Sequence, residues 1–114
     1  MSEPTLVKIE VFVPEDALAA VCAALAEAGA GRVGRYDHCF SMTQVHGTWR
    51  PLPGAQPYDG TVGQISEGDE IKLETNCAVE DVSAAVTAIR RVHPYEEPLI
   101  NIIPLLNSVY GGAV

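Results

Sequence analysis

The sequence has few basic residues and no clustered basic segment. It contains 7 lysines and arginines against 15 aspartates and glutamates, which gives a formal net charge of −8 over 114 residues. Proteins that bind nucleic acids or anionic membranes need grouped positive charges to contact phosphates, and basic groups here, such as Arg32 and Arg35, have no more than two members. The balance argues against nucleic acid and membrane partners and favours a metal cation or a protein partner.

Long apolar runs and paired cysteines are also lacking. No stretch reaches the ~20 apolar residues that span a bilayer, and residues 1–5 carry neither a basic cluster nor a signal-type apolar run. The three cysteines, at positions 22, 39 and 77, have no paired spacing. This argues against a disulfide framework and against a C-x-x-C zinc site. We therefore expect reduced thiols and a cytoplasmic location.

The composition indicates one folded domain. Hydrophobic residues make up 47% of the chain, which supports a packed core at this length. Residues 6–13 read as a strand, acidic residues at 15 and 16 begin a helix, and Gly29 and Gly31 end it. We expect a single domain over residues 1–114, with its core at about 6–105 and flexible termini.

A strand–helix unit occurs twice, at an offset of 64 residues. Lys8 and Glu10 of the first strand correspond to Lys72 and Glu74 of a second strand over 70–78. The same offset matches the apolar helix positions, which are 18, 21, 22 and 25 in the first unit and 82, 85, 86 and 89 in the second. Two copies of one supersecondary unit predict an internally repeated fold.

Each unit needs a further strand to complete it. Residues 36–43 and 45–50 alternate like the two arms of a hairpin, and residues 99–105 form a compact apolar strand. The prediction is an α+β, ferredoxin-like split βαβ fold (β-α-β-β-α-β) with a β-hairpin extension and both helices on one sheet face. The Pro/Gly-rich segment 51–68 is long enough to be a functional or mobile loop.

The second sheet face would be left uncovered by this arrangement. Candidate apolar residues for that face lie in the segments 39–49 and 100–103. A small domain cannot leave a large apolar face in water, and burial against copies of itself is the simplest remedy. We therefore expect a closed homo-oligomer.

Several short motifs resemble one known family over roughly residues 7–105. The motifs, in order, are Gly29-Ala30-Gly31 with Gly34, Tyr36, His38 and Cys39, then Gly47-Thr48, Pro57-Tyr58, Gly63, 70–74, His93-Pro94-Tyr95-Glu96-Glu97-Pro98 and Pro104-Leu105. They resemble the PII/CutA-like insert domain of the YqfO-type (Nif-three-like) dinuclear-metal-centre proteins. The last motifs are also similar to the trimeric CutA ion-tolerance proteins.

This resemblance has specific implications and one departure. It implies a ferredoxin-like fold and a trimer with the sheets facing inward. It also implies ligand binding in clefts between subunits, as in PII relatives, and a link to copper and other divalent ions, as in CutA relatives. The metal-binding core of the larger proteins is absent, so its hydrolase chemistry is not implied. Asn101 stands where an acid is expected in YqfO-type inserts.

The densest polar cluster consists of His93, Glu96 and Glu97. An imidazole and two carboxylates could ligate a divalent metal such as copper or zinc, with Pro94 and Pro98 fixing the turn. The alternative is a rigid helix-to-strand connection in which the prolines shape the chain and no ligand is needed. The sequence leaves both interpretations open.

Further candidates are spread along the chain. His38 and Cys39 are metal-ligand candidates, but on a regular strand neighbours point to opposite faces and cannot share one ion. Cys39 could act with another element or with its own copies around a threefold axis, or it could be a small hydrophobe. Aromatic side chains that could line a ligand cleft, or else bury interface area, are Tyr36, Trp49, Tyr58 and Tyr95.

The functional prediction follows from these observations. We expect a small oligomeric, preferably trimeric, PII/CutA-like regulatory protein that binds a ligand or a metal ion and is not an enzyme. No serine lies in a G-x-S-x-G elbow. One alternative is a structural oligomerisation module for a separately encoded partner protein, and another is a hydrolase-associated accessory domain.

Overall fold

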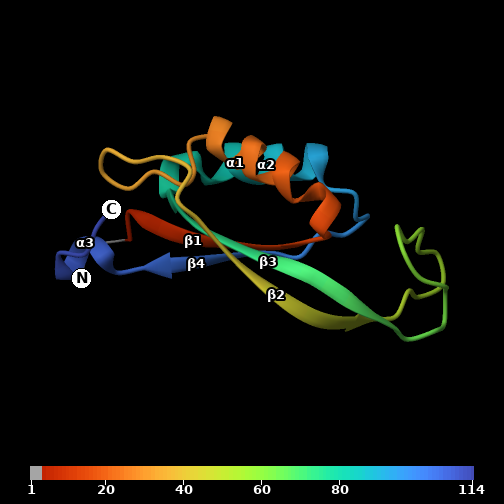
Figure 1. The fold of residues 1–114 in the computed structure, drawn as a ribbon. Helices are drawn as coiled ribbons and strands as arrows, with labels where there is room; N and C mark the ends of the chain where they lie inside the picture. The colour runs from red at the N-terminus through yellow and green to blue at the C-terminus, as the bar shows by residue number, and fades with distance from the viewer. Residues whose placement is uncertain (1–3) are drawn as a thin grey trace.

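Four antiparallel strands form one sheet in the computed structural model, which describes residues 4–114, and two helices cross one face of it (Figure 1). The strand order is β2-β3-β1-β4. The elements are β1 (Leu6–Val13), α1 (Leu18–Glu27), β2 (Phe40–Trp49), β3 (Ser66–Ala78), α2 (Val82–Val92), β4 (Ile100–Leu105) and the short α3 (Asn107–Tyr110). This is the predicted α+β split βαβ fold.

The internal repeat is visible in the geometry. The two 3₁₀ turns and the helices that follow them begin at residues 15 and 18 in the first unit and at residues 79 and 82 in the second, which keeps the offset of 64. β1 and β3 are antiparallel neighbours at the sheet centre, and Glu10 lies opposite Glu74. Because Glu74 is the repeat counterpart of Glu10, an approximate two-fold axis passes between these two residues.

The core lies between the helices and the two central strands. Its fully buried side chains include Ile9 and Val11 of β1, Leu73 of β3, Leu25 of α1 and Ile89 of α2. Each side chain of this size contributes about 1.5–3 kcal/mol when it is removed from water. The alternation in the strands and the helical spacing in α1 and α2 therefore supply the stability that holds the sheet and helices together.

A hairpin extension projects beyond the sheet. β2 pairs with β3 from Phe40 opposite Thr75 to Trp49 opposite Ser66, whereas β1 pairs with β3 only over 71–78. Residues 45–49 and 66–70 therefore form a two-stranded ribbon, hereafter the hairpin extension, which is seen in Figure 1 running past the helices. The predicted extension is confirmed.

The strand limits expected for this region were wrong. Residues 40–49 form one strand whose partner is β3, not two arms of a local hairpin over 36–43 and 45–50. The turn lies instead in the Pro/Gly segment, of which residues 50–65 connect the strands and residues 66–68 already belong to β3. Alternation continues unbroken from 40 to 49, and long-range pairing with β3 overrides the short-range hairpin pattern.

The start of β1 and the C-terminus lie near one another at the end of the sheet opposite the hairpin extension (Figure 1). Flexible termini were expected, and residues 1–3 lie outside the described residues. At the other end α3 follows β4, and the Val114 carbonyl accepts a hydrogen bond from the amide of Gly34 at 3.1 Å. Among residues 4–114 no helix has the length and apolar content needed to cross a bilayer.

Candidate functional site

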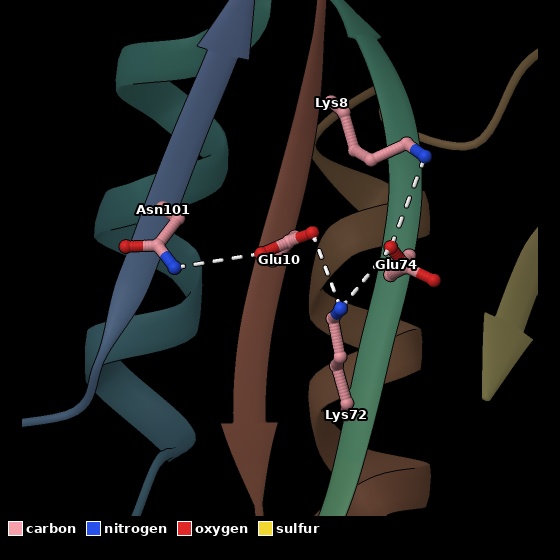
Figure 2. Close-up of polar contacts among 5 residues, drawn as sticks. All are labelled: Lys8, Glu10, Lys72, Glu74 and Asn101. Carbon is pink, nitrogen blue, oxygen red and sulfur yellow. Dashed lines mark hydrogen bonds and ion pairs between the residues drawn. The ribbon is translucent and has the colours of Figure 1, made fainter. Parts of the chain in front are cut away.

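The open sheet face carries a charged ladder at its centre. Lys72 Nζ lies 3.5 Å from a carboxylate oxygen of Glu10 and 3.8 Å from one of Glu74, and Lys8 Nζ lies 3.8 Å from Glu74 (Figure 2). Asn101 Nδ2 donates to the other oxygen of Glu10 at 3.4 Å. The ladder is built by the internal repeat, since the Lys8–Glu74 and Lys72–Glu10 pairs are repeat counterparts.

This ladder corrects the expectation of an apolar open face. The apolar candidates lie in 39–49 and 100–103, but the centre of the face belongs to β1 and β3, which place two lysines and two glutamates there. Two lysines balance two glutamates there, so each charge has an opposite neighbour. Partly exposed pairs of this kind contribute little stability each, and their main effect is to fix which surface can cover the face.

Asn101 helps to lower the pKa of Glu10. Burial raises the pKa of Glu10, but the hydrogen bond from Asn101 and the charge of Lys72 outweigh it, so the pKa lies below its ordinary value. An ionised acid at position 101 could not donate that hydrogen bond and would add a like charge. The Asn101 amide therefore makes an attractive contact with Glu10 at a position where a carboxylate would repel it.

Asn101→Asp should reverse the direction of the Glu10 shift and raise the pKa of Glu10, because a second carboxylate replaces the amide donor. The measurement is an NMR titration of the glutamate side-chain carbons. Asn101→Ala is the matched control, since it removes the hydrogen bond without adding charge and should raise the pKa by less. A Glu10 titration that is the same in all three proteins would contradict the contact with Asn101.

His93 ends α2 and is held inside the chain. It is only 8% exposed, and Nε2 lies 2.8 Å from the carbonyl oxygen of Phe12 while Nδ1 accepts the Tyr95 backbone N–H at 3.2 Å. This pattern fits a neutral ring with its proton on Nε2. Burial lowers the pKa of His93, and the hydrogen bond to Phe12 offsets part of that effect. Nε2 thus joins the end of α2 to β1, and Nδ1 fixes the turn that follows the helix.

Tyr95 connects the turn after α2 to the hairpin extension. Its hydroxyl donates to a carboxylate oxygen of Glu70 at 2.9 Å, and burial, followed by that hydrogen bond, raises the pKa of Tyr95. The ring also packs on the rings of His93 and Tyr58, with centroid separations of 4.7 and 5.8 Å. Tyr95 therefore connects three segments, which are the turn after α2, the hairpin extension and the loop that carries Tyr58.

The loop 50–65 folds back onto the same turn. The backbone N–H of Gln56 lies 3.1 and 3.2 Å from the two carboxylate oxygens of Glu96. Trp49 Nε1 donates to the Asp59 carbonyl at 2.9 Å, and Gly60, with φ of +115°, lies against the indole. A side chain at position 60 would collide with that ring. We call the contacts of this loop with the turn 93–98 the loop cluster.

The structure brings together some of the predicted cleft residues and separates one. Tyr58 and Tyr95 are in contact, and Trp49 anchors the loop that carries Tyr58. Tyr36 lies in the bridge of residues 33–36, near the chain end and away from the loop, and is 75% exposed. One chain therefore cannot place all four aromatics around one ligand.

The predicted metal ligands do not converge within one chain. The His38 ring pairs with Asp37 at 3.0 Å, and the Cys39 thiol donates to the Asp37 carbonyl at 3.6 Å. Both residues precede β2, and φ of His38 is +55°, so strand alternation does not govern them. In the described range 4–114, no three His, Cys, Asp or Glu side chains are arranged to hold a metal ion. Metal binding stays a prediction.

A cluster of one histidine and two carboxylates in the hairpin extension is not predicted by the sequence. His46 Nδ1 lies 2.8 Å from Asp69 Oδ1, and Nε2 lies 3.1 Å from Glu67 Oε1. His46 and Asp69 are cross-strand partners. The signal was the register of β2 against β3, which cannot be read before the two strands are known to pair.

The sequence is similar to one segment of longer bacterial proteins, although no family model matches the chain. It is 39% identical over 100 residues to a protein from Bacillus subtilis named GTP cyclohydrolase 1 type 2 homolog, covering 88% of this chain and 27% of that protein. A protein of the same name from Mycobacterium leprae is 37% identical over 102 residues, with coverages of 90% and 26%.

Two solved structures share the fold. A Bacillus cereus protein related to NIF3 superposes with a TM-score of 0.79 at 31% identity, covering 92% of this chain and 27% of that one. CutA1 from Shewanella sp. SIB1 superposes with a TM-score of 0.67 at 21% identity, covering 91% of this chain and 84% of that one.

These findings define the class and then the relatives. The fold is an α+β, ferredoxin-type domain like that of CutA and PII-like proteins. Most of the chain is homologous to a segment of the NIF3-related proteins named GTP cyclohydrolase 1 type 2 homolog, which confirms the resemblance seen in the motifs. The chain spans about a quarter of the length of these curated relatives.

Proposed function

We propose that the protein is a small PII/CutA-like regulatory or binding domain that assembles with copies of itself, acts in the cytoplasm and is not itself an enzyme. The observation that carries this proposal is the extent of the structural match, which covers 84% of CutA1 but only 27% of the NIF3-related protein. The matched residues thus correspond to most of a CutA protein and to one segment of the NIF3-related protein. The longer relatives are named for an activity, but this chain matches only about a quarter of their length, so we do not assign that activity to it.

Self-assembly is supported by the apolar edge of the sheet. β4 is an edge strand, and Ile102 and Ile103 on its two faces are 40% and 38% exposed, with Leu99 and Leu106 exposed beyond its ends. An edge strand with apolar side chains on both faces favours burial against another chain. The charge-balanced ladder beside it can meet a second copy without a net repulsion. We favour a trimer.

The bound species would lie where copies meet. Within one chain the metal-ligand candidates are separate, so a copper or zinc site needs ligands from more than one copy, and His38 and Cys39 on their exposed loop are placed for that. A CutA neighbour is described as a divalent cation tolerance protein, and we extend that property here only as a proposal. The aromatic faces of Tyr58 and Tyr95 offer a second place for a small planar ligand.

Light scattering and metal titration test this proposal together. We expect a native particle three times the 12.1 kDa chain mass at micromolar concentration and saturable uptake of zinc or copper by calorimetry. Cys39→Ser should weaken uptake, whereas Cys22→Ser, which lies against the core on α1, should not. A monomer would remove the basis for sites between copies.

One other function is supported by the same edge. If the wild-type particle assembles but takes up no metal, the domain serves as an oligomerisation module for a separately encoded protein partner. Stable co-purification of one defined partner with the apolar edge intact, and its loss in an Ile103→Lys variant, would then identify that role.

A further inference from the structure

Beyond Glu70, which Tyr95 holds at its base, the hairpin extension depends on its own cross-strand contacts. Within the described residues, 45–49 pair with 66–70 and β1 reaches only as far as residue 71 of β3. A two-stranded ribbon without a third strand is at best marginally stable in water. Side-chain pairs that bridge its strands therefore decide how well it is ordered.

His46 forms such a bridge through both of its ring nitrogens. Its two ring nitrogens lie 2.8 Å from Asp69 Oδ1 and 3.1 Å from Glu67 Oε1, and both carboxylates belong to β3. A carboxylate oxygen accepts hydrogen bonds, so both contacts are hydrogen bonds only when both nitrogens carry a proton. A neutral ring has one N–H and would turn a lone pair toward the second carboxylate. The geometry is thus built for the imidazolium.

We propose that protonation of His46 fastens the hairpin extension, so that the ribbon and the loop 50–65 at its end are held more firmly at mildly acidic pH than at mildly alkaline pH. The two carboxylates lie on opposite sides of the ring, and this arrangement favours a proton over a metal ion as the group that joins them. Nothing in the proposal depends on the oligomeric state or on a bound ligand.

The electrostatics give the direction of the effect. The hydrogen bonds that the His46 ring donates to Asp69 and Glu67 raise the pKa of His46 above its ordinary value of 6.5, against a smaller opposing effect of burial. These two groups of β3, the element packed against β2 here, supply the charges that act on the ring. A raised pKa in the folded state means that the stabilisation is complete below about 6.5 and is lost as the pH rises through the folded pKa.

The change reaches the loop cluster through Trp49. This residue ends β2 three positions after His46, and its indole N–H holds the Asp59 carbonyl of the loop. The loop in turn contacts Glu96 through the Gln56 amide. Trp49 is also the single tryptophan of the chain, so its fluorescence reports on this region alone.

Two titrations of the full chain test the proposal. Trp49 emission should change with pH in one step, at the same midpoint as the His46 ring carbons followed by NMR, and that midpoint should lie above 6.5. Asp69→Asn and Glu67→Gln should each lower the midpoint, and His46→Gln should abolish the emission step. His38→Gln is the matched control, because His38 pairs with its neighbour Asp37 and bridges no strands, and it should keep the step unchanged.

Amide exchange separates ordering from simple quenching of the indole. After correction for intrinsic rates, protection of residues 45–49 should fall in the wild type as the pH passes the His46 midpoint, and should stay flat in His46→Gln. A His46 midpoint at or below 6.5 would overturn the proposal. So would an emission step that persists in His46→Gln, or protection that does not change with His46 protonation.

Discussion

Replacing Gly31 with alanine should lower the free energy of unfolding by about 3 kcal/mol, measured by urea denaturation. Gly31 has φ of +83°, and a Cβ there would lie 2.9 Å from the ring of Phe40 and 3.3 Å from the Cys39 amide nitrogen. Its own N–H donates to the Asn76 carbonyl, and its carbonyl accepts from Cys39. The substitution therefore strains the backbone and separates the end of α1 from β2 and β3.

Gly34→Ala provides the matched control. Gly34 also has positive φ, +58°, but no atom of the described residues would lie within 4 Å of its Cβ. The alanine there carries only the backbone penalty, about 1 kcal/mol. The difference between the two variants measures the contact with Phe40, and equal losses would show that this contact does not constrain the chain. Neither variant should change ligand or metal preference, because both act on the fold.

The end of α1 shows what local signals can establish. Two glycines after an apolar helical face predicted a helix end with positive φ, and both Gly29 and Gly31 have it. The 64-residue repeat was equally readable, because each unit places its strand, its 3₁₀ turn and its helix within a single short segment. Such elements depend on neighbours in sequence, and so the fold class followed from the sequence.

The register of β2 illustrates what local signals miss. Residues 40–49 alternate throughout, and no residue in that run says whether the partner strand is local or distant. The partner proved to be β3, across the loop 50–65. That pairing creates the His46 cluster, whereas the charged ladder at the centre of the open face comes from the register of β1 against β3.

For the polar turn, the structural alternative expects Tyr95 to pack and a carboxylate to accept backbone hydrogen bonds, but it cannot name their partners. The sequence showed His93, Glu96 and Glu97 within one turn, yet their contacts involve Phe12 and Gln56, which are 81 and 40 residues away from His93 and Glu96 respectively. A cluster of polar residues in sequence says which groups need partners. Only the tertiary fold says whether the protein itself supplies them, as it does for His93.

His93→Ala should lower the free energy of unfolding by about 3 kcal/mol and leave zinc and copper uptake per chain unchanged. The substitution removes a nearly buried ring and leaves the Phe12 carbonyl and the Tyr95 N–H without their partners. Both ring nitrogens already serve these contacts, so no lone pair is free for a metal. Urea denaturation and calorimetric titration of the two proteins provide the two measurements.

A glutamine at position 93 and the pH dependence complete this test. His93→Gln keeps an N–H that can reach the Phe12 carbonyl and should lose about half as much stability as His93→Ala.

Because burial lowers the pKa of His93, the contribution of His93 to the free energy of unfolding is complete above the unfolded pKa of about 6.5 and is lost as the pH falls through the folded pKa. The gap between wild type and His93→Ala should therefore shrink in acid. If His93→Ala instead abolishes metal uptake in a particle of unchanged mass and stability, the ring is a metal ligand and its contacts to Phe12 and Tyr95 are secondary.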